Sequence, residues 1–261
     1  MQEAPIKVHI TGVYGLIGNL VYQHLISKEA KYEVYGSGRR TIGSERTHRD
    51  TVVALPEERF KIADLSDASA VSAALAGADA VLHIGAVPDP GASFDDVMSS
   101  NVRGTYNVLE ACRESGIKRL VYASSIMVNW GYAKYQEPYL SLQEGRMEDL
   151  PSPMPLITRH DPPRPTEPYS ASKVWGEGIC RTYSDAHEIS TVCLRIGWVN
   201  RENEAQGPFS KSIWCSHKDI AHIIERALAA TEQQTYDICY AVTDHEYRWV
   251  DLDHTRDSLG I

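Results

Sequence analysis

Hydrophobic and polar residues alternate in two different periodic patterns along this chain. A short β-branched run at 6–12 ends in glycine, and apolar residues then recur at intervals of three and four over 14–28. The first pattern predicts a buried strand and the second an amphipathic helix. The chain therefore opens with a strand, a tight turn and a helix.

The same unit recurs along most of the sequence. Further strands are predicted at 32–39, 59–65, 78–86, 118–125 and 190–199. Helices are predicted at 67–78, 101–116, 169–187 and 216–230, the last with Ser216 as its cap and Asp219 in its first turn. Strands that alternate with helices indicate βαβ units, so the expected fold class is α/β, a Rossmann-type doubly wound parallel sheet.

The alternation of predicted strands and helices stops between the fifth strand and the helix at 169–187. Eight of the thirteen prolines lie between 130 and 168, with few periodic apolar residues. We expect a long ordered loop, either a partial lid or a plain insertion, at 129–168. The interpretation for the whole is one domain over 1–261, in which 199–261 contributes a small substrate-binding lobe.

Charge and cysteine usage narrow the class of ligand. The net charge of −9 at pH 7 disfavours nucleic acid and anionic membranes as partners and leaves a small-molecule substrate as the expectation. The five cysteines form no C-x-x-C pair, which argues against a disulfide framework and a metal site. Because no run of about 18 apolar residues occurs, we expect a cytoplasmic protein.

The first turn carries three glycines, Gly12, Gly15 and Gly18. Glycine there permits a sharp turn and lets a pyrophosphate approach the backbone, and the following helix offers unpaired amides to the anion. The position directly after the first strand favours dinucleotide binding over an ordinary glycine-rich turn.

The end of the second strand distinguishes the two nicotinamide cofactors. NAD sites place an acid there, to bind the ribose 2′-hydroxyl. This chain has Gly38 followed by Arg39 and Arg40, which suit a 2′-phosphate. The sequence therefore favours NADP over NAD, unless the two arginines are solvated loop charges.

Five motifs, in this order, resemble the extended short-chain dehydrogenase/reductase family, also called the NAD-dependent epimerase/dehydratase family. They are T-G-x-x-G-x-x-G at 11–18, D-L at 64–65, Asn101, A-S-S at 123–125 and Y-x-x-x-K at 169–173. The resemblance implies a cofactor site formed by Gly12, Tyr14, Gly15, Leu16, Ile17, Gly18, Arg39, Arg40, Asp64, Leu65, Ile84, Gly85, Ala86, Asn101, Ser124, Tyr169, Lys173 and Ile196. For Asp64, helix capping is the alternative.

The chemistry of alcohol oxidation explains why a tyrosine, a lysine and a serine would be needed together. A hydride leaves a secondary alcohol only as the hydroxyl proton leaves, so Tyr169 is expected to be the base. Lys173, one helical turn on, is expected to stabilise the phenolate and to hold the nicotinamide ribose. The resemblance places the catalytic hydroxyl, which would bind the substrate oxygen, at Ser125.

The second half of the chain resembles the uronate dehydrogenases, a branch that oxidises hexuronates to lactones with NAD. Met127 and Phe209 stand where that branch has a histidine and a carboxylate-binding arginine, which leaves Lys211 or Arg201 near the second position. The expected substrate-binding residues are Val87, Ser125, Met127, Trp198, Phe209 and Trp214.

The sequence therefore predicts an NAD(P)-dependent oxidoreductase acting on a sugar or sugar-like molecule. A nucleotide-sugar epimerase or dehydratase that retains its cofactor is the first alternative, and a non-catalytic dinucleotide sensor is the second. The resemblance also implies a homodimer that pairs the helices beginning near Asp95 and Tyr169.

Overall fold

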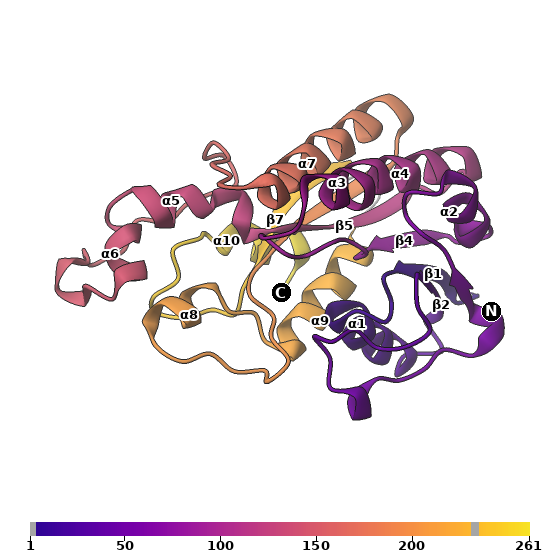
Figure 1. Ribbon diagram of the computed structural model, residues 1–261, viewed down its shortest axis with the longest axis horizontal. Coiled ribbons are helices and arrows are strands. Elements are labelled where there is room, and N and C mark those ends of the chain that lie inside the picture. The colour runs from indigo at the N-terminus through magenta and orange to yellow at the C-terminus, as the bar shows by residue number, and fades with distance from the viewer. Residues whose placement is uncertain (1–3, 231–234) are drawn as a thin grey trace.

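The computed structural model describes residues 4–230 and 235–261, and its centre is a seven-stranded parallel sheet (Figure 1). The strands follow the order β3-β2-β1-β4-β5-β6-β7. Their bounds are β1 Ile6–Thr11, β2 Tyr32–Gly38, β3 Phe60–Ile62, β4 Ala80–His83, β5 Arg119–Ser125, β6 Ser190–Ile196 and β7 Tyr236–Ala241. Strands β1 to β3 are added toward one edge of the sheet and β4 to β7 toward the other. The boundary between β1 and β4 is the topological switch point at which such sheets bind ligands. The predicted fold class is confirmed.

Helices cover both faces of the sheet, which is why every residue of the central strands β4 and β6 is buried. One face is covered by α1 (Leu16–Ile26), α9 (His217–Leu228) and α10 (Asp253–Leu259), which share one hydrophobic core. The other is covered by α2 (Ala68–Leu75), α4 (Gly104–Ser115) and α7 (Pro168–His187), which share a second. Figure 1 shows the two layers above and below the strands.

The predicted helices at 14–28, 67–78, 101–116, 169–187 and 216–230 are present, and Ser216 caps α9 as expected, accepting a hydrogen bond from Asp219 N at 3.0 Å. The helix around Asn101 begins earlier than predicted. It starts as α3 (Phe94–Asp96) and passes through a π-helical stretch, η3 (Val97–Arg103), before α4. Such π-helical stretches are frequent at functional sites.

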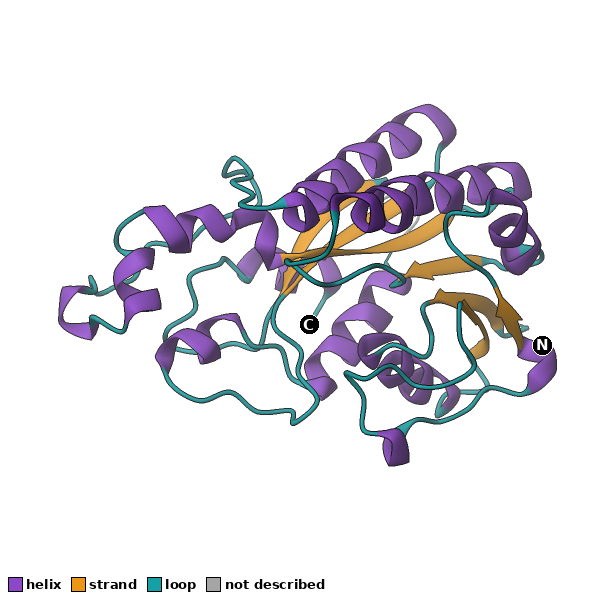
Figure 2. Ribbon diagram, viewed as in Figure 1, coloured by secondary structure: helices purple, strands orange, loops and turns teal. Residues whose placement is uncertain are grey.

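The proline-rich segment is more structured than its sequence indicates (Figure 2). It contains α5 (Trp130–Tyr135) and α6 (Tyr139–Glu144), two short helices that the prediction missed. Tyr139 and Leu142 of α6 are buried in a third hydrophobic core together with Trp249, so this segment packs against the C-terminal part of the chain. The remaining short helices are η1 (Arg49–Thr51), η2 (Glu57–Arg59), η4 (Ile126–Asn129), η5 (Met147–Asp149) and α8 (Pro208–Ile213).

Two further elements in the C-terminal part were not predicted. β7 pairs in parallel with β6, from Thr191 opposite Tyr236 to Ile196 opposite Ala241, and α10 packs beside it. Residues 199–261 therefore contribute one sheet strand and two covering helices as well as α8. All five cysteines are buried and free, as the sequence led us to expect.

Candidate active site

The turn after β1 is built so that only glycine fits. Gly12 has φ +69°, and a Cβ there would lie 2.7 Å from the Cα of Gly85. A Cβ on Gly18 would lie 2.3 Å from the carbonyl oxygen of Gly12. The turn therefore brings β1, β4 and α1 into direct backbone contact.

The N-terminus of α1 is open toward this turn. Gly15 is the N-cap, it offers no side-chain cap, and no acidic residue lies in the first turn. Backbone amides and the positive end of the helix dipole are thus available to an anion. The residues present fit the pyrophosphate of a dinucleotide.

A cavity of about 460 Å³ opens in front of this turn. It is lined by the thirteen predicted cofactor residues Gly12, Tyr14, Gly15, Leu16, Ile17, Gly18, Arg39, Arg40, Asp64, Leu65, Ile84, Gly85 and Ala86. It is also lined by Pro88, which the sequence offers as a substrate candidate beside Val87. The remaining lining residues were not predicted as site residues: Ser37, Gly38, Ile42, Ser44, Glu45, Arg46, Ala63, Ser100 and Val199. The cavity volume and its position at the switch point suit a dinucleotide.

At one end of the cavity, Arg39 and Arg40 follow β2 directly and are exposed. Asp64 lies opposite, where its carboxylate accepts hydrogen bonds from Ser66 N at 2.9 Å and Ser66 Oγ at 2.7 Å. These bonds, and the charge of Arg39, hold the pKa of Asp64 below its usual range. A carboxylate engaged in this way closes an Asx turn. The N-cap of α2 is Asp67, so the alternative role of Asp64 as a helix cap is wrong.

Asn101 holds the chain that follows β4 and donates no hydrogen bond into the cavity. Its side chain accepts a hydrogen bond from Val87 N at 2.8 Å and donates to Val87 O at 3.1 Å. It also donates to Ser172 Oγ at 3.2 Å. The π-helical stretch therefore fixes the segment after β4 to the helix α7, which carries Tyr169.

The start of α7 is defined by its capping residues. Glu167 accepts a hydrogen bond from Ser170 N at 3.0 Å, Ser170 Oγ accepts one from Glu167 N at 3.3 Å, and Pro168 is the first helical residue. This capping box with proline at its first position sets where the helix begins. Tyr169 and Lys173 consequently lie one helical turn apart in the first two turns of α7.

Ser125, Tyr169 and Lys173 are all buried and lie close together. Lys173 Nζ donates to Ala123 O at 2.8 Å and lies 5.8 Å from the centre of the Tyr169 ring. Ser125 ends β5, and its Oγ accepts a hydrogen bond from Met127 N at 3.1 Å. Ser125 pairs with Ile196 of β6, and none of Ser125, Tyr169 and Lys173 lines the cavity described above.

Burial dominates the electrostatics of this group. It raises the pKa of Tyr169, whereas a hydrogen bond with Ser125 and the charge of Arg46 act in the opposite direction. It also lowers the pKa of Lys173 to about 8. The stabilisation of a Tyr169 phenolate by Lys173 therefore stays a prediction.

The two remaining predicted cofactor residues, Ser124 and Ile196, are buried at the ends of β5 and β6. Ser124 Oγ donates to Glu177 at 2.6 Å, so its side chain faces the interior. Neither residue lines the cavity described above.

Apart from Pro88, none of the predicted substrate-binding residues lines this cavity. Trp198, 45% exposed, and Trp214 form a parallel β-bridge. Phe209 packs edge-on against Trp130, with ring centres 5.6 Å apart. His217 Nε2 binds Asn200 O at 2.7 Å, a structural role.

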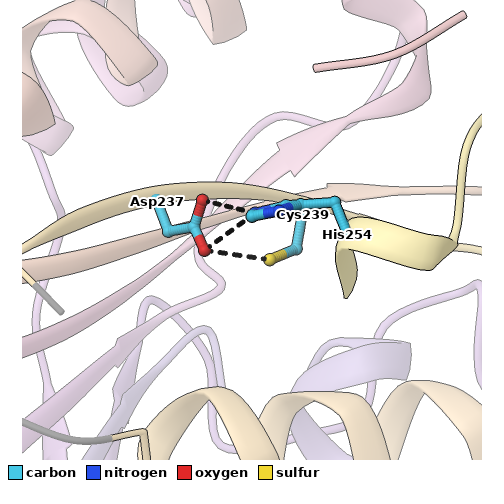
Figure 3. A group of neighbouring side chains, drawn as sticks. All are labelled: Asp237, Cys239 and His254. Carbon is cyan, nitrogen blue, oxygen red and sulfur yellow. Dashed lines mark hydrogen bonds and ion pairs between the residues drawn. The ribbon is translucent and has the colours of Figure 1, made fainter. Parts of the chain in front are cut away.

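Asp237, Cys239 and His254 form a group with metal-ligand chemistry among the described residues (Figure 3). The Asp237 carboxylate already binds Arg159 Nη1 at 2.5 Å and His254 Nε2 at 2.8 Å. Burial raises the pKa of the Cys239 thiol to about 12, away from the thiolate that binds metals. Since the Arg159 guanidinium supplies the positive charge there, the group is a structural clamp between β7 and α10.

The family model described as NAD dependent epimerase/dehydratase family matches residues 8–245. This chain belongs to that family, and the prediction of an enzyme of this family is confirmed. Among the described residues, no helix is long and apolar enough to cross a membrane.

Individual relatives are similar over almost the whole chain. The L-arabinose 1-dehydrogenase (NAD(P)(+)) of Haloferax volcanii is 29% identical, covering 97% of this chain and 94% of its own. The NAD-dependent glucose-6-phosphate dehydrogenase of the same organism is 27% identical, with 97% and 91% covered. A solved structure titled Mutated Uronate Dehydrogenase is 26% identical with a TM-score of 0.77, covering 98% of this chain and 80% of that one.

Proposed function

We propose that this protein is an NADP-preferring oxidoreductase that transfers a hydride between the nicotinamide and a hydroxyl or carbonyl group of a sugar or sugar-like molecule. The observation that carries the proposal is one cavity with a glycine turn at its centre. Arg39 and Arg40 lie on its wall directly after β2, and Ser125 ends β5, so all three lie at the carboxyl edge of the parallel sheet. The names of the three relatives support a sugar as the substrate.

The chain's own residues supply binding and proton transfer. The amides at the start of α1 would hold the pyrophosphate, and Arg39 and Arg40 the 2′-phosphate. The cofactor, when bound, supplies the hydride acceptor. Tyr169 takes the hydroxyl proton of the substrate, and Ser125 donates a hydrogen bond to the same oxygen.

Lys173 has a second role in this proposal. One of its three N–H groups is committed to Ala123 O, which leaves two for the ribose hydroxyls. Val87, Met127, Trp198, Phe209 and Trp214 are proposed to surround the sugar, and the tryptophans could offer it a stacking face.

A screen for net hydride transfer tests the function. The protein is incubated with NADP or NAD and with neutral sugars, uronates or sugar phosphates, and the absorbance of reduced nicotinamide is followed. We expect net reduction of NADP with a subset of these sugars. Conversion of a nucleotide sugar without net reduction, by protein that retains its cofactor through gel filtration, would instead identify an epimerase.

The protein is further proposed to be a homodimer through α3, η3, α4 and α7. Phe94, Met98, Tyr106 and Trp175 are exposed on these neighbouring helices, between 37% and 63% each. Exposed apolar residues grouped on one face favour association. Trp175→Asp should convert a dimer to a monomer in light scattering, whereas Tyr135→Asp, on the distant α5, should not. A monomeric wild-type protein would contradict the proposal.

A further inference from the structure

The connection between β2 and β3 folds back on α1. The side chain of Asn19 accepts a hydrogen bond from Val53 N at 3.0 Å and donates to Val53 O at 2.9 Å. Leu55 N donates to the phenol oxygen of Tyr14 at 3.1 Å. These contacts fix the returning half of the connection against the glycine turn and the helix that follows.

A tight turn at 44–47 fixes the outgoing half in the same place. Ser44 N donates to Tyr14 O at 2.9 Å. Thr47 is buried, and its N and Oγ1 donate to Ser44 O at 3.0 and 2.6 Å. Arg46 is held between these anchored residues, exposed and on the wall of the cavity.

Arg46 shares the cavity wall with Pro88 and Val199, which follow β4 and β6. Its charge acts on Tyr169, whereas the charge of Arg39 acts on Asp64 at the adenosine end. The same connection also approaches the segment after β6. The pKa of Glu202 is lowered first by hydrogen bonds from its own backbone and from Arg201, and further by the charge of His48.

The charge around the cavity is opposite in sign to that of the whole chain. The whole chain has a net charge of −9 at pH 7. The cavity wall has three arginines, Arg39, Arg40 and Arg46, and two acids, Glu45 and Asp64. Two arginines suffice for a 2′-phosphate, and the start of α1 suits the pyrophosphate. Arg46 has no hydrogen bond or ion pair with another described residue.

We propose that Arg46 binds a negatively charged group of the substrate, a carboxylate or a phosphate, and so selects acidic sugar derivatives over neutral ones. This inference rests on the proposed function, because it assigns the sugar to the same cavity. It also supplies the cation that the sequence lacks at Phe209. A guanidinium pairs with either anion through two parallel N–H groups.

The test separates binding from turnover. Protein saturated with NADPH, in which no sugar can be oxidised, is titrated by calorimetry with glucuronate, glucose 6-phosphate and glucose. We expect one of the two anions to bind best, and Arg46→Gln to weaken that anion by about 10-fold to 100-fold, the range of a charged hydrogen bond. Glucose binding and the Kd of NADPH should stay within about twofold, since neither uses Arg46 in this account.

Three controls make the result specific. Arg40→Gln should weaken NADPH binding and leave the sugar affinity unchanged, and Lys211→Gln and Arg201→Gln should affect neither. The inference would be overturned if Arg46→Gln weakened the binding of both NAD and NADPH relative to the wild type. It would also be overturned if the variant bound every sugar as tightly as the wild type does. If anions bind through Arg46 but no sugar reduces NADP in the wild type, the proposed hydride transfer fails, whereas the anion-binding role of Arg46 stands.

Discussion

Arg195 donates two parallel hydrogen bonds to Glu177, from Nε to Oε1 and from Nη2 to Oε2, each at 2.9 Å. Both side chains are buried. The same carboxylate accepts from Ser124 at 2.6 Å, and Arg195 Nη1 donates to Asn129 at 3.0 Å. The pair thus joins α7, one turn beyond Lys173, to β6 and to Ser124 and Asn129, which flank the segment 125–128.

Removing one partner of this pair should be costly, because it leaves the other charge buried and unpaired. Glu177→Ala is expected to lower the free energy of unfolding by about 3–5 kcal/mol, measured by urea denaturation. Asp185→Ala breaks the exposed pair with Arg181 on the same helix and should cost less than about 0.5 kcal/mol. Equal losses in the two variants would refute a special role for the buried pair.

The cofactor preference depends on Arg39 in this account. Arg39→Ala should weaken NADP binding by about 1.5–3 kcal/mol, the value of a charge-assisted hydrogen bond, and leave NAD binding nearly unchanged. Isothermal calorimetry with each cofactor measures both. Arg181→Ala, an exposed arginine on α7, is the control for a general effect of net charge. A uniform loss for NAD and NADP would assign Arg39 to the surface.

Acid should destabilise the protein through two buried imidazoles. Burial lowers the pKa of His9 to about 4 and that of His83 to about 3, from 6.5. His9 Nε2 shares a hydrogen bond with Ser37 Oγ, and both ring nitrogens of His83 bind threonine hydroxyls. Between pH 6.5 and these values the unfolded chain binds more protons, so stability falls as the pH falls through this window.

The measurement is the free energy of unfolding at several pH values from 7 to about 4.5, within the window set by these pKa shifts. His9→Gln keeps an acceptor or donor for Ser37 but cannot titrate, so its stability should depend less steeply on pH than that of the wild type. His160→Gln, at an exposed position, should leave the slope unchanged. Identical slopes for the wild type and His9→Gln would contradict the assignment.

Much of the fold could be predicted because its signals are local. The apolar runs of β1, β4, β5 and β6 and the glycine turn at Gly12 are each visible within a few residues. The strand β7 was missed because Asp237 interrupts its apolar pattern, and that carboxylate is stabilised by distant partners that include Arg159 and His254. The helices α5 and α6 were missed because prolines surround them, and their stability comes from packing against Trp249.

The site also contains residues that local motifs predict and residues that they do not. Tyr169, Lys173 and the glycines follow motifs with fixed spacing, whereas nothing near Arg46 marks it as a cavity residue. Its position depends on contacts of Asn19 and Tyr14 with residues more than thirty positions away. Contacts of that kind are set by the tertiary fold, so a single sequence does not display them.

The most direct test of the central claim compares Tyr169→Phe with the wild type, using NADP and the sugar found by the screen. Loss of the phenol should reduce kcat by at least about 100-fold, the usual contribution of a general base, with the Kd of NADP unchanged. Tyr135→Phe, at an exposed phenol on α5, should retain full activity. A Tyr169→Phe variant with near wild-type kcat would contradict the role of Tyr169 as the base.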